Sequence, residues 1–327
     1  MGNGDASMRR AAVGLVRCAG YEEYAAVRAA VRESFDLFGG IAALVRPGQR
    51  VLLKPNLLSA LPAEAGVNTH PSVVRAVAEE ALEAGGVVSI GDSPAFSRLD
   101  DTCAACGLDR VARELGIPIV PFNRPVWVPT RVPHGPARGF KVDRAILDAD
   151  VVINIPKLKS HGQLGFTAAA KNLYGCMPGK RKAWYHAYMH GDRRFAAFLA
   201  AFAETVRPAF NLVDAILAMH RAGPKRGDLL PVGLLVGGPD PFAVDTFLSQ
   251  LIAIQDADSL IVNAARRLGL GVTDPERIDC RGIDPATLPP FEFQHPMLVG
   301  TAFSLPRVVR SAWRSFIISR FRLPEKP

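Results

Sequence analysis

Short apolar runs alternate with longer segments of helical spacing along the first half of the chain. The helical segments cover residues 21–38, 71–84 and 99–115. The apolar runs lie at residues 12–18, 50–54, 87–90, 117–121 and 150–155. Because these runs lack polar alternation, they are typical of strands that are buried on both faces of a largely parallel sheet. The pattern therefore predicts an α/β fold with helices on both faces of the sheet, with or without a second, smaller α/β lobe.

The second half of the chain continues the pattern with less regular spacing. Residues 195–206 and 243–254 are predicted helices, and residues 211–217 and 233–236 are predicted strands. No internal repeat marks a domain boundary. We therefore expect one α/β domain over residues 1–300, with its motifs concentrated at residues 48–255.

The last segment, residues 301–327, is predicted to form a basic amphipathic helix. One face is apolar and another is basic: Val309, Ala312, Trp313, Phe316 and Ile317 against Arg307, Arg310 and Arg314. Such a helix is typical of contact with a membrane surface. It also fits a helix docked on the domain or on a second copy of the chain, which leaves a homo-oligomer open. We favour docking.

Polar loops follow three of the predicted strands. These loops are Lys54–Asn56, Gly91–Ser93 and Pro156–His161. In open parallel sheets, ligands bind beyond the carboxyl ends of the strands. The three loops therefore predict one ligand site at that edge of the sheet.

The segment from Lys157 to His186 is the most unusual part of the chain. It combines cationic side chains, two histidines and many small residues: Lys157, Lys159, Lys171, Lys180, Arg181 and Lys182, with His161, His186, Gly162, Gly165 and Ala168–Ala170. Ammonium groups together with accessible backbone N–H groups are suited to a phosphate or carboxylate ligand. Histidines add a general base or metal ligands. The alternative is a solvated basic loop without a ligand.

These observations assign roles to named residues. We predict His161, Lys171 and His186 as catalytic residues. The residues predicted to hold an anionic substrate or cofactor are Lys54, Asn56, Asp92, Ser93, Lys157, Lys159 and Asn172. His161, His186 and Asp245 are the predicted ligands of a divalent metal ion.

Several of these carboxylates and thiols have structural alternatives. Asp92 is equally suited to binding a metal, capping a helix or holding a substrate hydroxyl. Asp240 is predicted to cap the helix that follows it, and Thr69 the helix at residue 71. Cys103 and Cys106 form a C-x-x-C pair within a helical segment, and we interpret them as buried, inert thiols.

Charge and hydropathy limit the class of protein. The formal net charge of +8 is compatible with an anionic small molecule, nucleic acid or anionic lipid as partner. No apolar run reaches the roughly 18–20 residues of a membrane span. The short apolar stretch after Met1–Arg10 is interrupted by Arg17, unlike a signal peptide. We therefore expect a cytoplasmic protein.

An ordered set of short motifs resembles the "domain of unknown function 362" family. The motifs are Lys54-Pro-Asn56, Thr69-His-Pro71, Gly91-Asp-Ser93, Pro156–His161, Lys171-Asn172 with Gly175, and Asp240–Asp245. No agreed activity comes with this family. Many members carry a ferredoxin-like module with clustered cysteines. This sequence lacks such a cluster, so we expect no built-in iron–sulfur centre.

A second, fainter resemblance is to the nickel-pincer lactate racemases. It is carried by His161, Lys171, Pro178-Gly179 and His186. The resemblance implies that Lys171 would carry a nickel-pincer nucleotide and that His186 would bind the nickel. However, the racemases have a histidine base in the loop that matches Gly91–Ser93, and Gly-Gly-Arg at Ala168–Ala170. Lactate racemisation is therefore not expected.

Two functions remain open. The first is an enzyme that acts on an anionic substrate or cofactor, with metal-assisted or redox chemistry favoured. The sequence has no G-x-S-x-G, Walker A or G-x-G-x-x-G motif to support acyl transfer, ATP hydrolysis or dinucleotide binding. The second is a basic binding module for nucleic acid or an acidic partner, in which Trp184, Tyr185 and Tyr188 would stack on bases.

Overall fold

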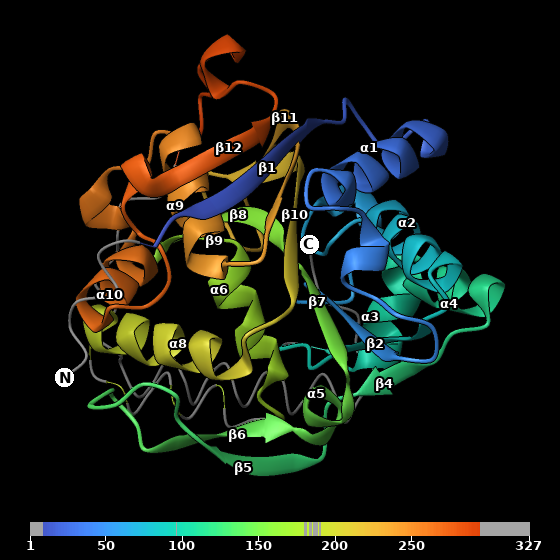
Figure 1. Cartoon of the computed structure of the whole chain (residues 1–327), viewed down its shortest axis with the longest axis horizontal. Coiled ribbons are helices and arrows are strands. Elements are labelled where there is room, and N and C mark those ends of the chain that lie inside the picture. Colours follow the sequence, from blue (N-terminus) through green and yellow to red (C-terminus); the bar gives the residue numbers. More distant parts are fainter. Residues whose placement is uncertain are drawn as a thin grey trace.

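The computed structural model describes residues 9–95, 97–179, 182, 185, 189 and 191–294. Its main sheet has the strand order β12-β1-β11-β10-β7-β2-β3-β4, and β8 joins it beside β10 and carries β9 (Figure 1). The strands are β1 (Ala11–Arg17), β2 (Arg50–Pro55), β3 (Val87–Asp92), β4 (Ile119–Pro121), β7 (Val151–Ile155), β8 (Lys157–His161), β9 (Gly165–Thr167), β10 (Phe210–His220), β11 (Asp228–Gly238) and β12 (Ile278–Gly282). The predicted α/β class is confirmed.

Most pairings in this sheet are parallel. The run β10-β7-β2-β3-β4 is parallel throughout, and β12 is parallel to β1. In contrast, β11 is antiparallel to both β1 and β10, and β9 is antiparallel to β8. The largely parallel sheet that the sequence predicts is therefore a mixed sheet with a parallel half, and this half carries the polar loops.

Helices cover both faces of the sheet (Figure 1). On one side lie α1 (Tyr24–Asp36), α2 (Pro71–Glu83), α3 (Leu99–Cys106) and α4 (Leu108–Leu115). On the other lie α6 (Ala169–Asn172), α8 (Asp192–Val206), α9 (Pro241–Leu251) and α10 (Leu260–Leu268). Adjacent strand residues point into different cores: Leu53 packs with the first group and Leu52 with the second. This burial on both faces explains why the strands are apolar without alternation.

A small two-stranded sheet lies beside the main sheet. It pairs β5 (Pro125–Pro129) antiparallel with β6 (Gly139–Asp143), and α5 (Arg144–Asp148) leads from it into β7. This sheet occupies the proline-rich region between β4 and α5. The proposed division at residue 300 and the C-terminal amphipathic helix fall at or beyond the edge of the described residues, so both stay predictions.

Three local predictions were wrong. Residues 99–115 form two helices, because Gly107 adopts a left-handed conformation with φ of 79°. His70, and not Thr69, caps α2 by accepting a hydrogen bond from the Ser72 N–H. The start of the basic segment is strand β8 and not a loop.

No helix in the described ranges combines the length and the apolar character that crossing a bilayer requires.

Truncation of Phe202 is expected to destabilise the fold strongly. Its ring is fully buried in α8 and meets Phe140 edge-on at a centroid distance of 5.2 Å. Phe202→Ala should lower the free energy of unfolding by about 3–5 kcal/mol, measured by urea denaturation. Trp127→Ala is the control, because that side chain is 54% exposed, and its cost should stay near 0.5 kcal/mol. Equal losses in the two variants would contradict this core assignment.

Candidate functional site

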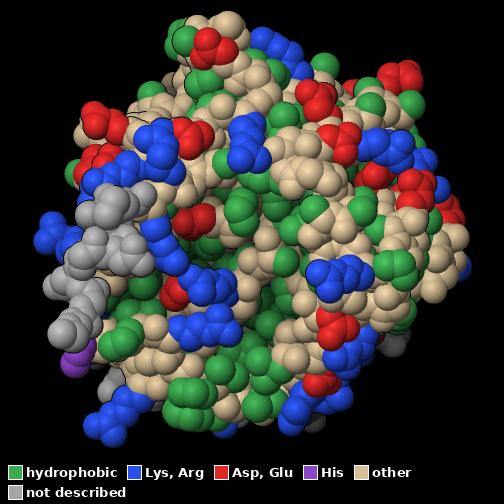
Figure 2. Space-filling model, viewed as in Figure 1, with side chains coloured by type: hydrophobic (Ala, Val, Ile, Leu, Met, Phe, Trp, Pro, Cys, Tyr) green, Lys and Arg blue, Asp and Glu red, His purple; other side chains and the backbone are tan. Residues whose placement is uncertain are grey.

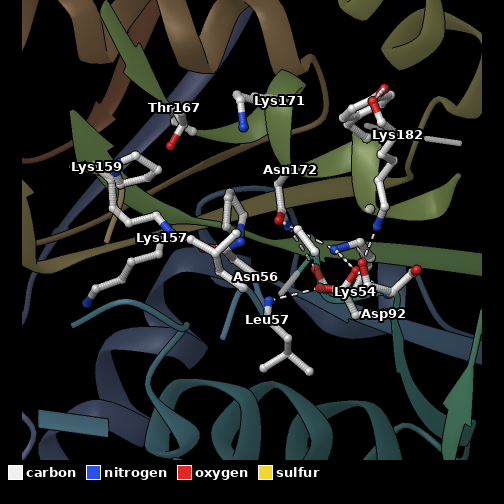
Figure 3. A pocket seen from close by; sticks show the side chains of 18 residues that line it. Lys54, Asn56, Leu57, Asp92, Lys157, Lys159, Thr167, Lys171, Asn172 and Lys182 are labelled. Atoms are coloured by element: carbon white, nitrogen blue, oxygen red, sulfur yellow. Dashed lines mark hydrogen bonds and ion pairs between the residues drawn. The ribbon is translucent and has the colours of Figure 1, made fainter. Parts of the chain in front are cut away.

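A pocket opens where the parallel strands end (Figure 3). In the sheet, Lys54 of β2 is in register with Asn154 of β7, and β3 ends beside β2 at Asp92. The cavity has a volume of about 90 Å³. Since one water needs roughly 10–15 Å³ on the same measure, the cavity has room for a small anion or the charged end of a larger molecule. Its polar lining is Lys54, Asn56, Asp92, Ser93, Lys157, Lys159, Thr167, Lys171, Asn172 and Lys182.

The base of the pocket is a buried ion pair between Lys54 and Asp92. The Lys54 Nζ and the Asp92 Oδ1 are 2.9 Å apart, and neither side chain is more than 3% exposed. Asp92 also accepts hydrogen bonds from the backbone N–H groups of Ser93 (2.7 Å) and Leu57 (2.8 Å). A Cβ at Gly175 would lie 2.3 Å from the carboxylate, so only glycine allows this close approach. The ion pair with Lys54 was not among the three roles predicted for Asp92, and it leaves both carboxylate oxygens engaged.

Lys157 belongs to a second buried pair, formed with Asp214. The Nζ–Oδ2 distance is 3.0 Å, and burial lowers the pKa of Lys157 while Asp214 acts in the opposite direction. Tyr21 donates to Asp214 Oδ1 (2.6 Å), the His70 N–H donates to Oδ2 (3.0 Å), and the Tyr21 and His70 rings stack at 3.7 Å. The Lys157 ammonium group is thus held by this cluster.

Lys159 is buried without an acidic partner. Its ammonium group donates to the Asn56 side-chain oxygen and to the Val67 carbonyl (2.7 Å). Burial lowers its pKa well below the usual value, and the nearby charges of Lys171 and Lys157 lower it further. Asn56, predicted to contact a ligand, therefore holds Lys159 in place.

Lys171 and Lys182 complete the basic lining. Among the described residues, Lys171 has no hydrogen bond or ion pair, and Figure 3 shows it between Lys159 and Lys182. Burial, followed by the charges of Lys182 and Lys54, lowers the pKa of Lys171 to about 8. Lys182 donates to the Ser93 carbonyl, and burial lowers its pKa to about 8 as well.

The pocket therefore carries an excess of positive charge. Five lysines of the described residues line it, and acidic partners are present for two, Lys54 and Lys157. Three ammonium groups are left without a carboxylate: those of Lys159, Lys171 and Lys182. Unpaired ammonium groups at low dielectric are costly, and a bound anion relieves that cost.

A chain of buried asparagines lies beneath the pocket. Asn172 donates to the Lys54 carbonyl (3.1 Å) and to the Asn154 side chain (2.8 Å), and Asn154 donates to Asn211 (2.9 Å). Asn172, predicted to contact a cofactor, thereby fixes the end of α6 against β2. Asn154 and Asn211 were not predicted from the sequence as part of the site, although each is a polar residue within an apolar run.

Asp245 supports α6 from below. Its two carboxylate oxygens accept hydrogen bonds from the N–H groups of Ala169 (2.7 Å) and Ala170 (3.0 Å), the residues directly before Lys171. Burial raises the pKa of Asp245 to about 7. Asp240 caps α9, as predicted.

Of the two histidines predicted to be catalytic, His161 is among the described residues. His161 ends β8 outside the pocket lining, and its Nδ1 accepts a hydrogen bond from the Gln163 N–H (3.2 Å). His186 lies outside the described residues. Within the described ranges, no three His, Cys, Asp or Glu side chains form a group that would hold a metal ion. The catalytic and metal-binding roles of His161, His186 and Asp245 therefore stay predictions.

Cys103 and Cys106 are both buried free thiols away from the pocket lining. Burial raises the pKa of each, which disfavours the reactive thiolate. Their position agrees with the prediction of inert thiols.

The comparison with family models decides the family. A model described as "Domain of unknown function (DUF362)" matches residues 51–250. The chain belongs to this family. The ordered motifs of the sequence analysis lie in or beside the matched region, and Lys54, Asp92, Lys171 and Asp245 are the motif residues that organise the pocket.

A relative corrects the predicted location. The chain is 38% identical over 314 residues to the "Thylakoid-associated protein sll1697" of Synechocystis sp., covering 95% of this chain and 96% of the relative. The expectation of a cytoplasmic protein, which rested on the lack of membrane and signal segments, is contradicted by this thylakoid-associated relative.

Two solved structures are distantly similar. The lactate racemase apoprotein of Thermoanaerobacterium thermosaccharolyticum matches with a TM-score of 0.42 and 12% identity, covering 73% of this chain and 56% of that one. The chain thus spans little more than half of that structure's length. A loganic acid methyltransferase matches with a TM-score of 0.24 and 11% identity. Neither similarity is close enough to support an argument about function.

Replacement of Asp245 should change how stability depends on pH. Because the pKa of Asp245 rises from 3.8 to about 7 on folding, the folded state binds more protons between these values and loses stability as pH rises. Asp245→Asn removes this decline while one oxygen still accepts a backbone hydrogen bond. The free energy of unfolding is measured by urea denaturation at pH 5 and pH 8. Between these two pH values the wild type should lose more of it than the variant does, by on the order of 1–4 kcal/mol. Parallel pH profiles would contradict the assignment.

Proposed function

We propose that this chain is an enzyme whose lysine pocket binds the carboxylate or phosphate group of an anionic substrate or cofactor. One observation carries the proposal: three ammonium groups of one pocket, those of Lys159, Lys171 and Lys182, lack an acidic partner among the described residues. An anion placed among them would gain charge-assisted hydrogen bonds in a site with little competing water.

The burial of the lysines favours a small ligand over nucleic acid. Lys54, Lys157 and Lys159 are at most 3% exposed, whereas phosphate backbones are bound by solvent-facing cations. On the face in Figure 2, basic and acidic side chains are interspersed. Tyr185, one of the predicted stacking residues, packs on Phe198 at 4.8 Å. These features support a pocket rather than an extended groove.

The described donors do not fit a divalent metal ion. Protonated lysines offer no lone pair, and the one carboxylate of the described lining, Asp92, is paired with Lys54 and accepts from two backbone N–H groups. Metal-assisted or redox chemistry stays a prediction from the sequence. The nickel-pincer nucleotide is implied by the fainter resemblance alone and is not expected.

The chain's own residues supply a simpler chemistry. With a pKa of about 8, Lys171 exchanges protons near neutral pH, as a general acid or base must. Lys159 and Lys182 would stabilise negative charge that develops on an oxygen of the bound substrate.

Sulfate tests the proposed pocket, because it remains a dianion across the pH range used. Its affinity, measured by titration calorimetry, should fall as pH rises from 7 to 9.5, since Lys171 and Lys182 lose their protons around pH 8. Lys171→Ala should weaken binding about ten- to a hundredfold, the worth of one charged hydrogen bond of about 1.5–3 kcal/mol.

The matched control is Lys141→Ala, which removes a lysine of β6 outside the pocket lining and should leave sulfate affinity unchanged. Equal sulfate affinity in the wild type and Lys171→Ala would refute the pocket. If Lys171→Ala instead weakened binding of a single-stranded oligonucleotide and left sulfate binding intact, the binding-module alternative would be favoured.

A further inference from the structure

The geometry points to Lys171 as a nucleophile that forms an imine with the carbonyl group of a 2-oxo acid bound in the pocket. This inference rests on the proposed function and names its substrate class: a small molecule with a ketone or aldehyde next to its carboxylate. The lysines around Lys171 bind the carboxylate, and Lys171 itself bonds to the carbon.

The lysines of the pocket differ in their partners. Lys54 and Lys157 are tied to carboxylates, and Lys159 is tied to the Asn56 side chain and the Val67 carbonyl. Lys182 donates to the Ser93 carbonyl. Among the lysines of the described lining, Lys171 is the one whose Nζ has no hydrogen bond or ion pair with a described residue. Its amine is therefore available for reaction.

The backbone of Lys171 is held on both sides along the chain. Asp245 accepts hydrogen bonds from the N–H groups of the two residues before Lys171. The residue after it, Asn172, donates hydrogen bonds to β2 and β7. These contacts fix the direction in which the side chain enters the pocket. A fixed approach lowers the entropic cost of bond formation with a bound carbonyl group.

The protonation state of Lys171 also favours imine formation. Imine formation requires a neutral amine, and a lysine with a pKa of about 8 is neutral in about one molecule in ten at pH 7. An ordinary lysine with a pKa of 10.5 is neutral in about one in 3,000. Burial and neighbouring cations, which lower the pKa here, are the usual means of activating a lysine nucleophile.

The reaction is balanced without a further reagent. The neutral Nζ adds to the carbonyl carbon and forms a C–N bond, while the carbonyl electron pair moves to oxygen, which takes a proton. The carbinolamine then loses water and becomes the imine, so that one carbonyl and one amine give one imine and one water. Figure 3 shows Lys159 and Lys182 to either side of Lys171 in that view. Both lack an acidic partner among the described residues, and in this proposal they bind the carboxylate.

Reductive trapping tests this inference. The full-length protein is incubated with pyruvate, glyoxylate or 2-oxoglutarate and with sodium cyanoborohydride, which delivers hydride to an imine and leaves a stable secondary amine. Intact mass and peptide mapping then count and locate the modified lysines. With at least one of these acids, the expected result is a single adduct on Lys171, suppressed at least tenfold by excess sulfate.

Lys171→Arg is the matched variant, because it keeps the positive charge and removes the nucleophile. It should still bind sulfate in calorimetry and should lose the adduct. Lys141→Arg, which changes a lysine outside the pocket lining, should keep the adduct. If Lys171→Arg does not fold, the wild type alone tests the inference. The peptide map then shows which lysine carries the adduct, and excess sulfate shows whether the adduct forms in the anion site. The inference is overturned if none of the three acids modifies Lys171, or if Lys171 and Lys141 react equally. Sulfate binding that persists in that case would retain the proposed anion site and discard only the imine.

Discussion

The ion pair between Lys54 and Asp92 joins the ends of β2 and β3 beneath the pocket, and both side chains are almost completely removed from water. Two charges buried in this way are tolerated only when their remaining donors and acceptors are satisfied. Here the Leu57 and Ser93 N–H groups and the Pro55 carbonyl complete the pair. The backbone at Gly175 packs directly against both side chains. The pair therefore also limits how closely the segment that carries Lys171 approaches the sheet.

Above this neutral base, the pocket becomes more cationic. The segment that carries Lys171 is anchored from below by Asp245 and from the side by the asparagine chain. Neither anchor supplies a free negative charge to the lining. The fold thus places Lys159, Lys171 and Lys182 so close together that the charge of Lys171 lowers the pKa of Lys159 and the charge of Lys182 lowers the pKa of Lys171. Such an arrangement stores electrostatic free energy that an anionic ligand releases on binding.

Much of the fold could be predicted from the sequence, because a parallel sheet covered on both faces produces apolar runs without alternation. The position of the site could be predicted for a similar reason, since Lys54, Asp92 and Lys157 each come at or directly beyond a strand end. The strand β8 could not, because its sequence, Lys-Leu-Lys-Ser-His, has the composition of a solvated loop. Its lysines are buried because distant parts of the chain supply their partners. Lys157 pairs with Asp214, and Lys159 donates to Asn56 and Val67. For the same reason, the contact of Asp245 with α6 could not be inferred. Its two hydrogen bonds join residues that are separated by 76 and 75 positions in the sequence.

The central claim is that the unpaired pocket lysines form an anion site, and a crystal structure with selenate tests it most directly. Selenate has the charge and shape of sulfate, and its anomalous scattering identifies it without ambiguity. The account predicts a selenate ion in the pocket, in contact with the Nζ of Lys171 and of Lys159 or Lys182. Selenate bound at surface arginines while the pocket contains only water would contradict the account.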